Sequence, residues 1–316
     1  MSMPVAIVGA GSIGVAFAVV FARAGLTVRC WDPDPAALAR AEHDLADRLA
    51  LLRTHDLLDE EPHVIARRVS FGGDLARAVT GAVLVQECAP ERLELKRELF
   101  ADLARLTGPD VVLVSSSSAI RASLIADGLP EADRMLVGHP GNPPYLLSVI
   151  EVVPAPETHP DAVKRACAAY SAAGLQPVVL GREVEGFVFN RLQGALLREA
   201  YCLLRDGVAS VEDIDTVVRL GLGLRWAVIG PFETADLNTR GGITAHAEKM
   251  GPAYERMGAE RGQHDPWTPD LVARADAQRR ALLPLDGWED RVRWRDERLM
   301  ELLAAVRPRE GRSTVD

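Results

Sequence analysis

Lysine, cysteine and clusters of positive charge are scarce in this sequence. Only three lysines, Lys96, Lys164 and Lys249, occur among 316 residues, so arginine supplies nearly all of the positive charge. The formal net charge is −9 and no basic block stands out, which argues against a nucleic-acid partner and against an anionic membrane surface. A bias in base composition explains the scarcity of lysine, and a lysine that survives such a bias merits attention.

Cysteine spacing also excludes some classes of protein. The four cysteines, Cys30, Cys88, Cys167 and Cys202, are scattered and form no C-x-x-C pair. Such spacing fits neither a metal site nor a disulfide framework. We therefore expect free thiols, no metal and a cytoplasmic protein.

The apolar run over residues 5–22 resembles a signal or membrane segment only in length. It contains three glycines at patterned spacing, lacks a basic leader and an A-x-A cleavage site, and is closed by Arg23. We interpret it as a strand followed by a buried helix, and we expect no membrane association.

Short β-branched runs alternate with helical patterns through the first half of the chain. This alternation predicts an α/β fold of the Rossmann type, with a doubly wound, mostly parallel sheet. One connection, residues 33–68, is long enough for two helices with a break near residues 54–57, and we expect a helical hairpin there. The expected strands, mostly continuous apolar runs, are Pro4–Val8, Leu26–Trp31, Val83–Glu87, Val111–Val114, Met135–Val137, Val149–Val153 and Pro177–Leu180.

Strand patterns stop near Glu185. Residues 187–206 have helical periodicity, and Ser210 followed by two acidic residues is typical of a helix start. We predict an α/β domain over residues 1–185 and a second, all-helical domain over residues 186–316, with a frayed polar end from Arg307.

A glycine motif after the first expected strand predicts a dinucleotide site. Gly9, Gly11 and Gly14 form G-x-G-x-x-G at the mouth of the following helix, with Ser12 and Ile13 inside the motif. The first glycine permits a tight turn, the second lets the backbone approach a pyrophosphate, and the third lets helix and strand pack closely. The helix N-terminus then offers N–H groups to the anion.

Asp32 ends the second expected strand, 18 positions after Gly14. A carboxylate at this place accepts hydrogen bonds from ribose hydroxyls and repels a 2′-phosphate, so NAD is favoured over NADP. The alternative is an ordinary turn residue in a segment rich in proline.

Three polar features downstream are candidates for catalysis. Four serines, Ser115 to Ser118, end a strand at the edge where open α/β sheets bind ligands, although a polar turn would look the same. His139 follows an apolar run, and the next strand brings in Glu151. A histidine suits the removal of a hydroxyl proton, and a carboxylate on its other nitrogen fixes the tautomer. Asn190 lies at the start of the helical half of the chain and is the third candidate. The alternative is that it is an ordinary polar residue in the first turn of a helix.

Together these segments resemble the L-3-hydroxyacyl-CoA dehydrogenase superfamily over nearly the full length of the chain. The branch with lambda-crystallin and L-gulonate 3-dehydrogenase is the most similar. Besides the glycine motif, the resemblance rests on five segments: PERLELK ending at Lys96, HPGNPPY from His139, GFVFNRLQ from Gly186, RWAVIGPFET from Arg225 and WRDERLMEL from Trp294.

The resemblance implies an NAD-dependent dehydrogenase that acts on a small molecule. It implies that His139 is the general base in oxidation, that Glu151 orients it, and that Ser118 contacts the substrate hydroxyl. Asn190 is implied to contact the substrate or the nicotinamide region.

The resemblance also implies further contacts to NAD and an oligomeric state. Glu91 and Lys96 are implied to contact the ribose–nicotinamide half, and Asn142 to lie against the nicotinamide. The helical domain is implied to form a homodimer interface and to close the cleft.

Two departures from the thioester enzymes favour a free hydroxy acid, such as L-gulonate. Acidic residues outnumber basic ones over residues 42–61, which suits the phosphates of coenzyme A poorly. Arg225 is suited to bidentate binding of a free carboxylate, unless it is a surface or interface residue. The alternatives are a 3-hydroxyacyl-CoA dehydrogenase of fatty acid metabolism and a non-catalytic, crystallin-like NAD-binding protein.

Overall fold

The structure is a computed structural model that describes residues 4–227, 230–238 and 242–261, together with residues 270, 281, 284, 286, 290, 293, 297, 300 and 301. It divides into two compact units, of which the first comprises the chain up to Arg191 and from Arg293 onward, and the second comprises Leu192–Val292. Segment 186–191 thus belongs to the first unit. The boundary near residue 185 stays a prediction, and the expected fraying from Arg307 falls outside the described residues.

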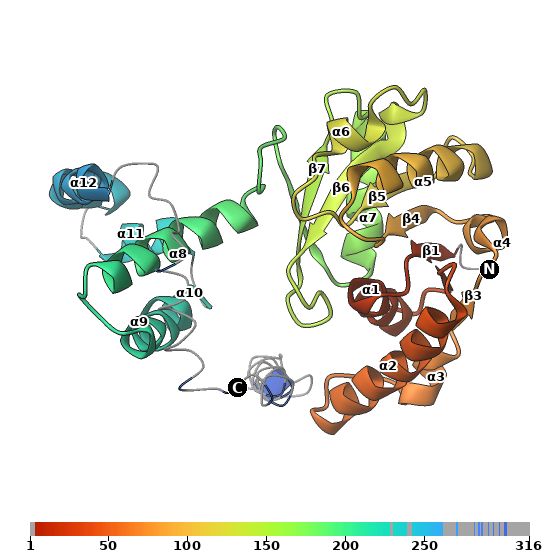
Figure 1. The fold of residues 1–316 in the computed structure, drawn as a ribbon, viewed down its shortest axis with the longest axis horizontal. Coiled ribbons are helices and arrows are strands. Elements are labelled where there is room, and N and C mark those ends of the chain that lie inside the picture. The colour runs from red at the N-terminus through yellow and green to blue at the C-terminus, as the bar shows by residue number, and fades with distance from the viewer. Residues whose placement is uncertain are drawn as a thin grey trace, which may run out of the picture. The chain divides into compact units, whose positions relative to one another are not determined.

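One eight-stranded sheet forms the frame of the first unit (Figure 1). The strand order is β3-β2-β1-β4-β5-β6-β7-β8, and neighbours are parallel except for the antiparallel pair β6 and β7. The strands are β1 (Val5–Val8), β2 (Val28–Trp31), β3 (Val69–Gly72), β4 (Leu84–Glu87), β5 (Val112–Ser115), β6 (Met135–Pro140), β7 (Val149–Pro154) and β8 (Gln176–Val179).

Helices cover both faces of this sheet. One face carries α1 (Ser12–Arg23), α2 (Pro35–Thr54), α3 (Pro62–Ala66) and α7 (Pro160–Ala172). The other carries α4 (Leu75–Val79), α5 (Leu93–Leu106) and α6 (Ala122–Ala126), and the short 3-10 helix η1 (Ala132–Arg134) precedes β6.

Successive side chains of β1 point to opposite faces of the sheet, and both faces are buried, which explains why its sequence is apolar throughout. Val5 and Ile7 pack into the core under α1, whereas Ala6 and Val8 pack into the core under α5. A strand covered on both faces has no solvent side, so polar alternation is absent. The predicted doubly wound, mostly parallel fold is confirmed.

The strand β3 was not among the expected strands. It lies at the edge of the sheet, and its residues are only partly buried or exposed, so it lacks the continuous apolar run of the central strands. The predicted helical hairpin between β2 and β3 is present as α2 and α3.

In the second unit the described residues are helical or in loops. The helix α8 (Phe189–Arg205) leads into it from the first unit, followed by α9 (Val211–Val217), the π-helix η2 (Val218–Gly223), α10 (Leu224–Trp226), α11 (Pro231–Asn238) and α12 (Gly242–Arg261). Ser210 caps α9 as expected, because its Oγ accepts a hydrogen bond of 3.1 Å from the N–H of Asp213. No helix in the described part of the chain is long and apolar enough to cross a lipid bilayer.

The order of the strands locates the ligand-binding edge. From β1 the chain moves outward to β2 and β3, then returns to β4 on the other side of β1. In open α/β sheets ligands bind beyond the carboxyl ends of the strands at such a reversal. The ends of β1 and β4 therefore border the candidate site.

Candidate active site

The turn between β1 and α1 packs tightly against neighbouring backbone at two of its glycines and is open at the third. Gly9 has a φ of 109°, and a Cβ there would lie 2.7 Å from the backbone carbonyl carbon of Cys88. A Cβ at Gly14 would lie 1.9 Å from the carbonyl oxygen of Gly9. Around Gly11, in contrast, no described atom lies within 4 Å of such a Cβ. A larger residue is thus excluded at Gly9 and Gly14, and the turn stays open at Gly11.

Gly11 is also the N-cap of α1. Within the described part of the chain no side chain caps this helix, so its first N–H groups are available to an anion. Ser12 begins α1 beside them, and Ile13 packs against the core on the α1 side. These features fit the pyrophosphate of a dinucleotide.

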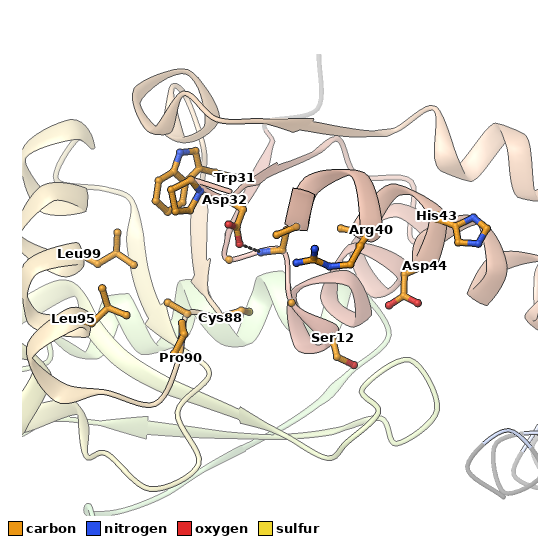
Figure 2. Close-up of a pocket in the computed structure, with 17 residues that line it drawn as sticks. Ser12, Trp31, Asp32, Arg40, His43, Asp44, Cys88, Pro90, Leu95 and Leu99 are labelled. Atoms are coloured by element: carbon orange, nitrogen blue, oxygen red, sulfur yellow. Dashed lines mark hydrogen bonds between the residues drawn. The ribbon is translucent and has the colours of Figure 1, made fainter. Parts of the chain in front are cut away.

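An open pocket of about 820 Å³ adjoins this turn (Figure 2). Its walls come from the glycine turn, the end of β2, one side of α2 and the loop from β4 to α5. Figure 2 shows Leu95 and Leu99 of α5 on one side of Asp32, and Arg40 and Asp44 of α2 on the other. The pocket has the size and the lining that a nucleotide requires.

Both carboxylate oxygens of Asp32 accept backbone hydrogen bonds. Oδ2 accepts from the N–H of Ala10 at 2.9 Å, drawn as a dashed line in Figure 2, and Oδ1 accepts from the N–H of Asp34 at 3.0 Å. These bonds hold the carboxylate at the end of β2 against the glycine turn. A ribose would meet a negative charge there, and a 2′-phosphate would be repelled.

Arg48, on α2, ties the glycine turn to other elements. Its Nη1 and Nη2 donate to the carbonyl oxygen and the hydroxyl of Ser12, each at 3.0 Å, and Nη2 donates to Asp44 at 2.9 Å. The guanidinium carbon lies 5.7 Å from the centre of the Tyr145 ring, in the loop between β6 and β7. Arg48 thus links the turn that begins α1 to the loop that follows His139.

His139 and Glu151 are register partners on the antiparallel strands β6 and β7. The Nδ1 of His139 lies 2.7 Å from Oε2 of Glu151, and the two residues are only 5% and 3% exposed. Burial by itself would raise the pKa of Glu151, but hydrogen bonds from His139, Phe189 and Val188 outweigh it and lower that pKa. An ionised carboxylate only accepts hydrogen bonds, so Nδ1 carries the proton and the lone pair of the neutral ring lies on Nε2.

The other oxygen of Glu151 anchors the start of α8. Its Oε1 accepts from the N–H groups of Val188 at 2.7 Å and Phe189 at 3.0 Å. Two successive residues with positive φ, Gly186 at 75° and Phe187 at 50°, turn the chain just before these groups. The GFVFN segment therefore has a physical role, because it aims two backbone donors at the carboxylate that holds His139.

Two aromatic rings flank the imidazole. The ring centre of His139 lies 5.4 Å from that of Phe187 and 6.1 Å from that of Phe189. Among the described residues, Nε2 of His139 has no hydrogen-bond partner. The ring is therefore fixed on its Nδ1 side and available on its Nε2 side.

The backbone of Ser118 is held from two directions. Its N–H donates to Oε1 of Glu91 at 3.0 Å, and its carbonyl oxygen accepts from Nδ2 of Asn190 at 3.0 Å. Burial alone would raise the pKa of Glu91, but hydrogen bonds from Ser117 and Ala119 and the charge of Lys96 lower it. The structure thus brings together Ser118, Asn190 and Glu91, which lie far apart in the sequence.

Lys96 is buried beneath this group rather than directed into the open pocket. Its Nζ donates to both carboxylate oxygens of Glu87, at 2.7 Å and 2.9 Å, and to the carbonyl oxygen of Ala89 at 3.1 Å. An ammonium has three N–H donors, and these acceptors use all three. Direct contact of Lys96 with NAD stays a prediction.

Two further candidate residues are exposed. Asn142 lies in the loop between β6 and β7 and precedes a cis peptide bond to Pro143. Arg225 lies on α10 in the second unit and has no hydrogen-bond or ion-pair partner among the described residues. Their contacts with nicotinamide and substrate stay predictions, and the WRDERLMEL segment lies mostly outside the described residues.

Two family models match consecutive parts of the chain. The NAD binding domain of 3-hydroxyacyl-CoA dehydrogenase matches residues 4–184, and the C-terminal domain of the same family matches residues 186–282. The chain belongs to the 3-hydroxyacyl-CoA dehydrogenase family. This confirms the resemblance, the use of NAD and the assignment as a dehydrogenase that acts on a CH–OH group.

Similar proteins include crystallin homologues and enzymes. The dehydrogenase is 42% identical to the lambda-crystallin homolog of Bos taurus, over 80% of this chain and 79% of that one. It is 34% identical to L-carnitine dehydrogenase of Pseudomonas aeruginosa, over 97% and 95%. The solved structure of 5-formyl-3-hydroxy-2-methylpyridine 4-carboxylic acid 5-dehydrogenase, an NAD+ dependent dismutase, aligns with a TM-score of 0.81 at 29% identity, over 98% and 100%.

Sequence reasoning about this dehydrogenase missed three residues that support the site. Glu87 gave a usable signal, because a charged residue closes a fully buried strand at the same sheet edge as Ser115. Arg48 gave none, since one more arginine on an exposed helix is ordinary in this chain. Ser117, whose hydroxyl donates to Glu91, was hidden in a run of four serines.

Proposed function

We propose that this dehydrogenase oxidises the 3-hydroxyl of a small, free L-3-hydroxy acid of the L-gulonate type to the 3-keto acid, with His139 as general base. The observation that carries the proposal is the buried 2.7 Å contact between Nδ1 of His139 and Oε2 of Glu151. It fixes the tautomer and the orientation of the imidazole, whose second nitrogen is free of partners among the described residues.

The chemistry of the protein residues then follows. Nε2 of His139 takes the hydroxyl proton as the bond between carbon and hydrogen breaks, and Glu151 stabilises the imidazolium that forms. In the reverse direction the imidazolium returns the proton to the oxygen. When bound, NAD accepts the hydride from the substrate carbon.

The residues for NAD are proposed from the first unit. The turn from Gly9 to Gly14, including Ser12 and Ile13, would receive the pyrophosphate. Asp32 would accept from the adenosine ribose, and Oε2 of Glu91 would be available to the second ribose. Asn142 is proposed to lie against the nicotinamide, and Lys96 is proposed to contact the ribose–nicotinamide half together with Glu91.

The choice of a free acid is supported by charge pairing in the helical hairpin. Three of its five arginines are closely paired with nearby carboxylates: Arg48 with Asp44 at 2.9 Å, Arg53 with Glu61 at 2.9 Å and Arg68 with Glu60 at 2.6 Å. Paired arginines are poor ligands for the phosphates of coenzyme A. Two of the similar proteins are named for small substrates, L-carnitine and a pyridine carboxylic acid.

Ser118 and Asn190 are proposed to hold the substrate beside His139, and Arg225 to bind its carboxylate. The alternative substrate is a short-chain 3-hydroxyacyl-CoA, which the name of the matched family favours. Parallel initial-rate measurements with NAD would compare L-gulonate, L-3-hydroxybutyrate and L-carnitine with 3-hydroxybutyryl-CoA. We expect saturation with a free acid, and turnover of the thioester alone would select the alternative.

We further propose that the protein is a cytoplasmic homodimer. The cysteines Cys30, Cys88, Cys167 and Cys202 are free thiols, which suits a reducing compartment. The second unit exposes large apolar side chains, including Leu220 at 58%, Leu224 at 61% and Phe232 at 78%. Such a surface is typical of an interface, and sedimentation equilibrium would distinguish a dimer from a monomer.

A further inference from the structure

We propose that Arg48 couples the glycine turn to the loop between β6 and β7, because it holds Ser12 of the turn and the ring of Tyr145 in the loop. Arg48 would thus be a positioning residue that links binding of the cofactor to the order of the catalytic loop. The proposal rests on the proposed function only to the extent that His139 and Asn142 are taken to act at the reacting end of NAD.

The loop between β6 and β7, residues 141–148, directly follows the strand end that holds His139. Most of its residues are buried, whereas Asn142 is exposed. Three hydrogen bonds close its backbone: from the N–H of Gly141 to the carbonyl oxygen of Val149 at 2.9 Å, from Leu146 to Pro143 at 3.0 Å and from Leu147 to Pro143 at 2.8 Å. A loop closed in this way moves as a unit, so its anchor sets the position of Asn142.

Tyr145 is the anchor of this loop. It is 6% exposed and belongs to the core on the α1 side of the sheet. Nη1 of Arg23, at the end of α1, donates to its carbonyl oxygen at 2.8 Å. The guanidinium carbon of Arg48 lies 5.7 Å from the centre of its ring, which is within the range of a cation–π attraction. The loop is therefore held by α1, which begins at the glycine turn, and by α2, which lines the pocket.

The same guanidinium holds both oxygen atoms of Ser12, each at 3.0 Å. Because the hydroxyl oxygen accepts from Arg48, its single O–H remains available to an anion at the start of α1. Ser12 is exposed and lines the pocket, whereas the side chain of Arg48 is 17% exposed and is paired with Asp44. A planar guanidinium that is bonded to Ser12 cannot follow it without shifting over the Tyr145 ring.

Arg48 thus lies between the two halves of the proposed cofactor site. The turn would receive the pyrophosphate, and the loop would place Asn142 against the nicotinamide beside His139. A displacement of about 1 Å in a positioning group can lower the rate about 10²-fold. A contact that transmits the position of the turn to the loop can therefore control turnover.

Arg68 offers a matched control for this role. Its side chain is 24% exposed, is paired with Glu60 at 2.6 Å, and donates to the carbonyl oxygen of Ala22 at 3.0 Å. It therefore resembles Arg48 in burial, in its carboxylate partner and in its bond to the backbone of α1. Among the described residues, its bonds reach neither the glycine turn nor residues 141–148.

Hydrogen exchange of the full-length protein separates coupling from direct contact. ADP-ribose is the probe, because it contains the pyrophosphate and both riboses of NAD but no nicotinamide. In the wild type we expect saturating ADP-ribose to slow exchange of a peptide that covers residues 141–149 by at least about fivefold, the lower end of ordinary coupling between sites. Arg48→Met and Tyr145→Leu should lose this slowing at saturating ADP-ribose, whereas Arg68→Met should keep it.

Kinetics and unfolding provide the second measurement. The double variant of Arg48→Met and Tyr145→Leu is compared with the single variants in kcat for any hydroxy substrate that the wild type accepts, and in the urea midpoint. We expect each single variant to lower kcat between about tenfold and about 10²-fold. The double variant should fall no further than the more severe single variant, because both act through one contact. Arg68→Met should unfold at lower urea and keep its kcat.

Four results would overturn the proposal. If ADP-ribose binds the wild type without slowing the loop, the two sites are not coupled. Wild-type kcat and unchanged slowing in Arg48→Met would show that Arg48 serves only the fold. If Arg48→Met needs more ADP-ribose but still slows the loop at saturation, Arg48 is only a cofactor ligand. Losses in kcat that multiply in the double variant would show that Arg48 and Tyr145 act independently.

Failure of the proposed function would be recognised separately. The exchange experiment uses no substrate and does not depend on which group removes the hydroxyl proton. The role of His139 is judged instead by whether His139→Gln abolishes turnover, and the choice of substrate by the comparison of free acids with the thioester.

Discussion

The hydroxyl of Tyr170 occupies the space that a side chain at Gly138 would need. A Cβ at Gly138 would lie 2.3 Å from that oxygen and 2.7 Å from Cγ1 of Val114. Tyr170 is fully buried and donates a 2.6 Å hydrogen bond to Gln86. Because Gly138 directly precedes His139, the packing of Tyr170 against β6 bears on the position of His139.

Gly138→Ala should therefore lower both stability and activity. Overpacking a filled core costs about 1–3 kcal/mol, measured as a change in the free energy of unfolding in urea. Gly108→Ala is the control, because no described atom lies within 4 Å of a Cβ there. Equal stability of the Gly138 variant and the wild type would mean that Tyr170 has room to move.

His139→Gln should abolish most of the turnover without loss of the cofactor. Loss of a general base typically costs about 10²–10⁴-fold in kcat, while most of the residues proposed for NAD follow β1, β2 and β4. Stopped-flow kinetics would give kcat, and quenching of tryptophan fluorescence would give NADH affinity. If the variant no longer binds NADH, His139 has a structural role instead.

The ionisation of Glu151 should appear in the pH dependence of stability. Burial alone would raise its pKa, but hydrogen bonds from His139 and the start of α8 lower it below the ordinary value. A carboxyl with a lowered pKa in the folded state binds fewer protons than in the unfolded chain, so its stabilising effect is present above about pH 4.3 and is lost as pH falls through the folded pKa.

Urea midpoints of the wild type and of Glu151→Gln, measured between about pH 7 and about pH 3, test this sign. We expect the difference in stability to be largest near neutrality and to shrink in acid. A difference that grows with acidification would contradict a lowered pKa.

Asp32→Ala should weaken NAD binding and relax the discrimination against NADP. The variant removes the negative charge beside the ribose and leaves the N–H of Ala10 without its acceptor. Dissociation constants for NADH and NADPH measure both effects. Asp47→Asn, on the exposed side of α2, is the control, and an unchanged NADH to NADPH ratio in the Asp32 variant would refute the ribose role.

Arg225→Ala should raise KM for free hydroxy acids with little change in NADH affinity. A bidentate arginine contributes about 1.5–3 kcal/mol as a charged hydrogen-bond partner, which corresponds to a rise in KM of roughly tenfold or more. Arg219→Ala, on the neighbouring η2, controls for loss of charge. An unchanged KM would rule out carboxylate binding by Arg225.

Much of the fold could be predicted because it depends on local patterns. Strands covered on both faces are mostly apolar, so β1, β4 and β5 could be predicted, whereas the edge strand β3 could not. The G-x-G-x-x-G motif is also local, because its glycines lie within a single turn. The positive φ of Gly9 and the close contact of Gly14 with the carbonyl oxygen of Gly9 restrict both positions to glycine.

The sequence by itself therefore determined the doubly wound sheet, the dinucleotide turn and the polar residues at the strand ends. Only the tertiary structure decided how those residues pair. Glu151 holds backbone groups 37 and 38 residues away, and Arg48 holds Ser12 across 36 residues. Lys96 faces Glu87 rather than the pocket. The direction of a side chain and the partners that neutralise its charge depend on which strands the crossover helices bring together, and no local pattern encodes that.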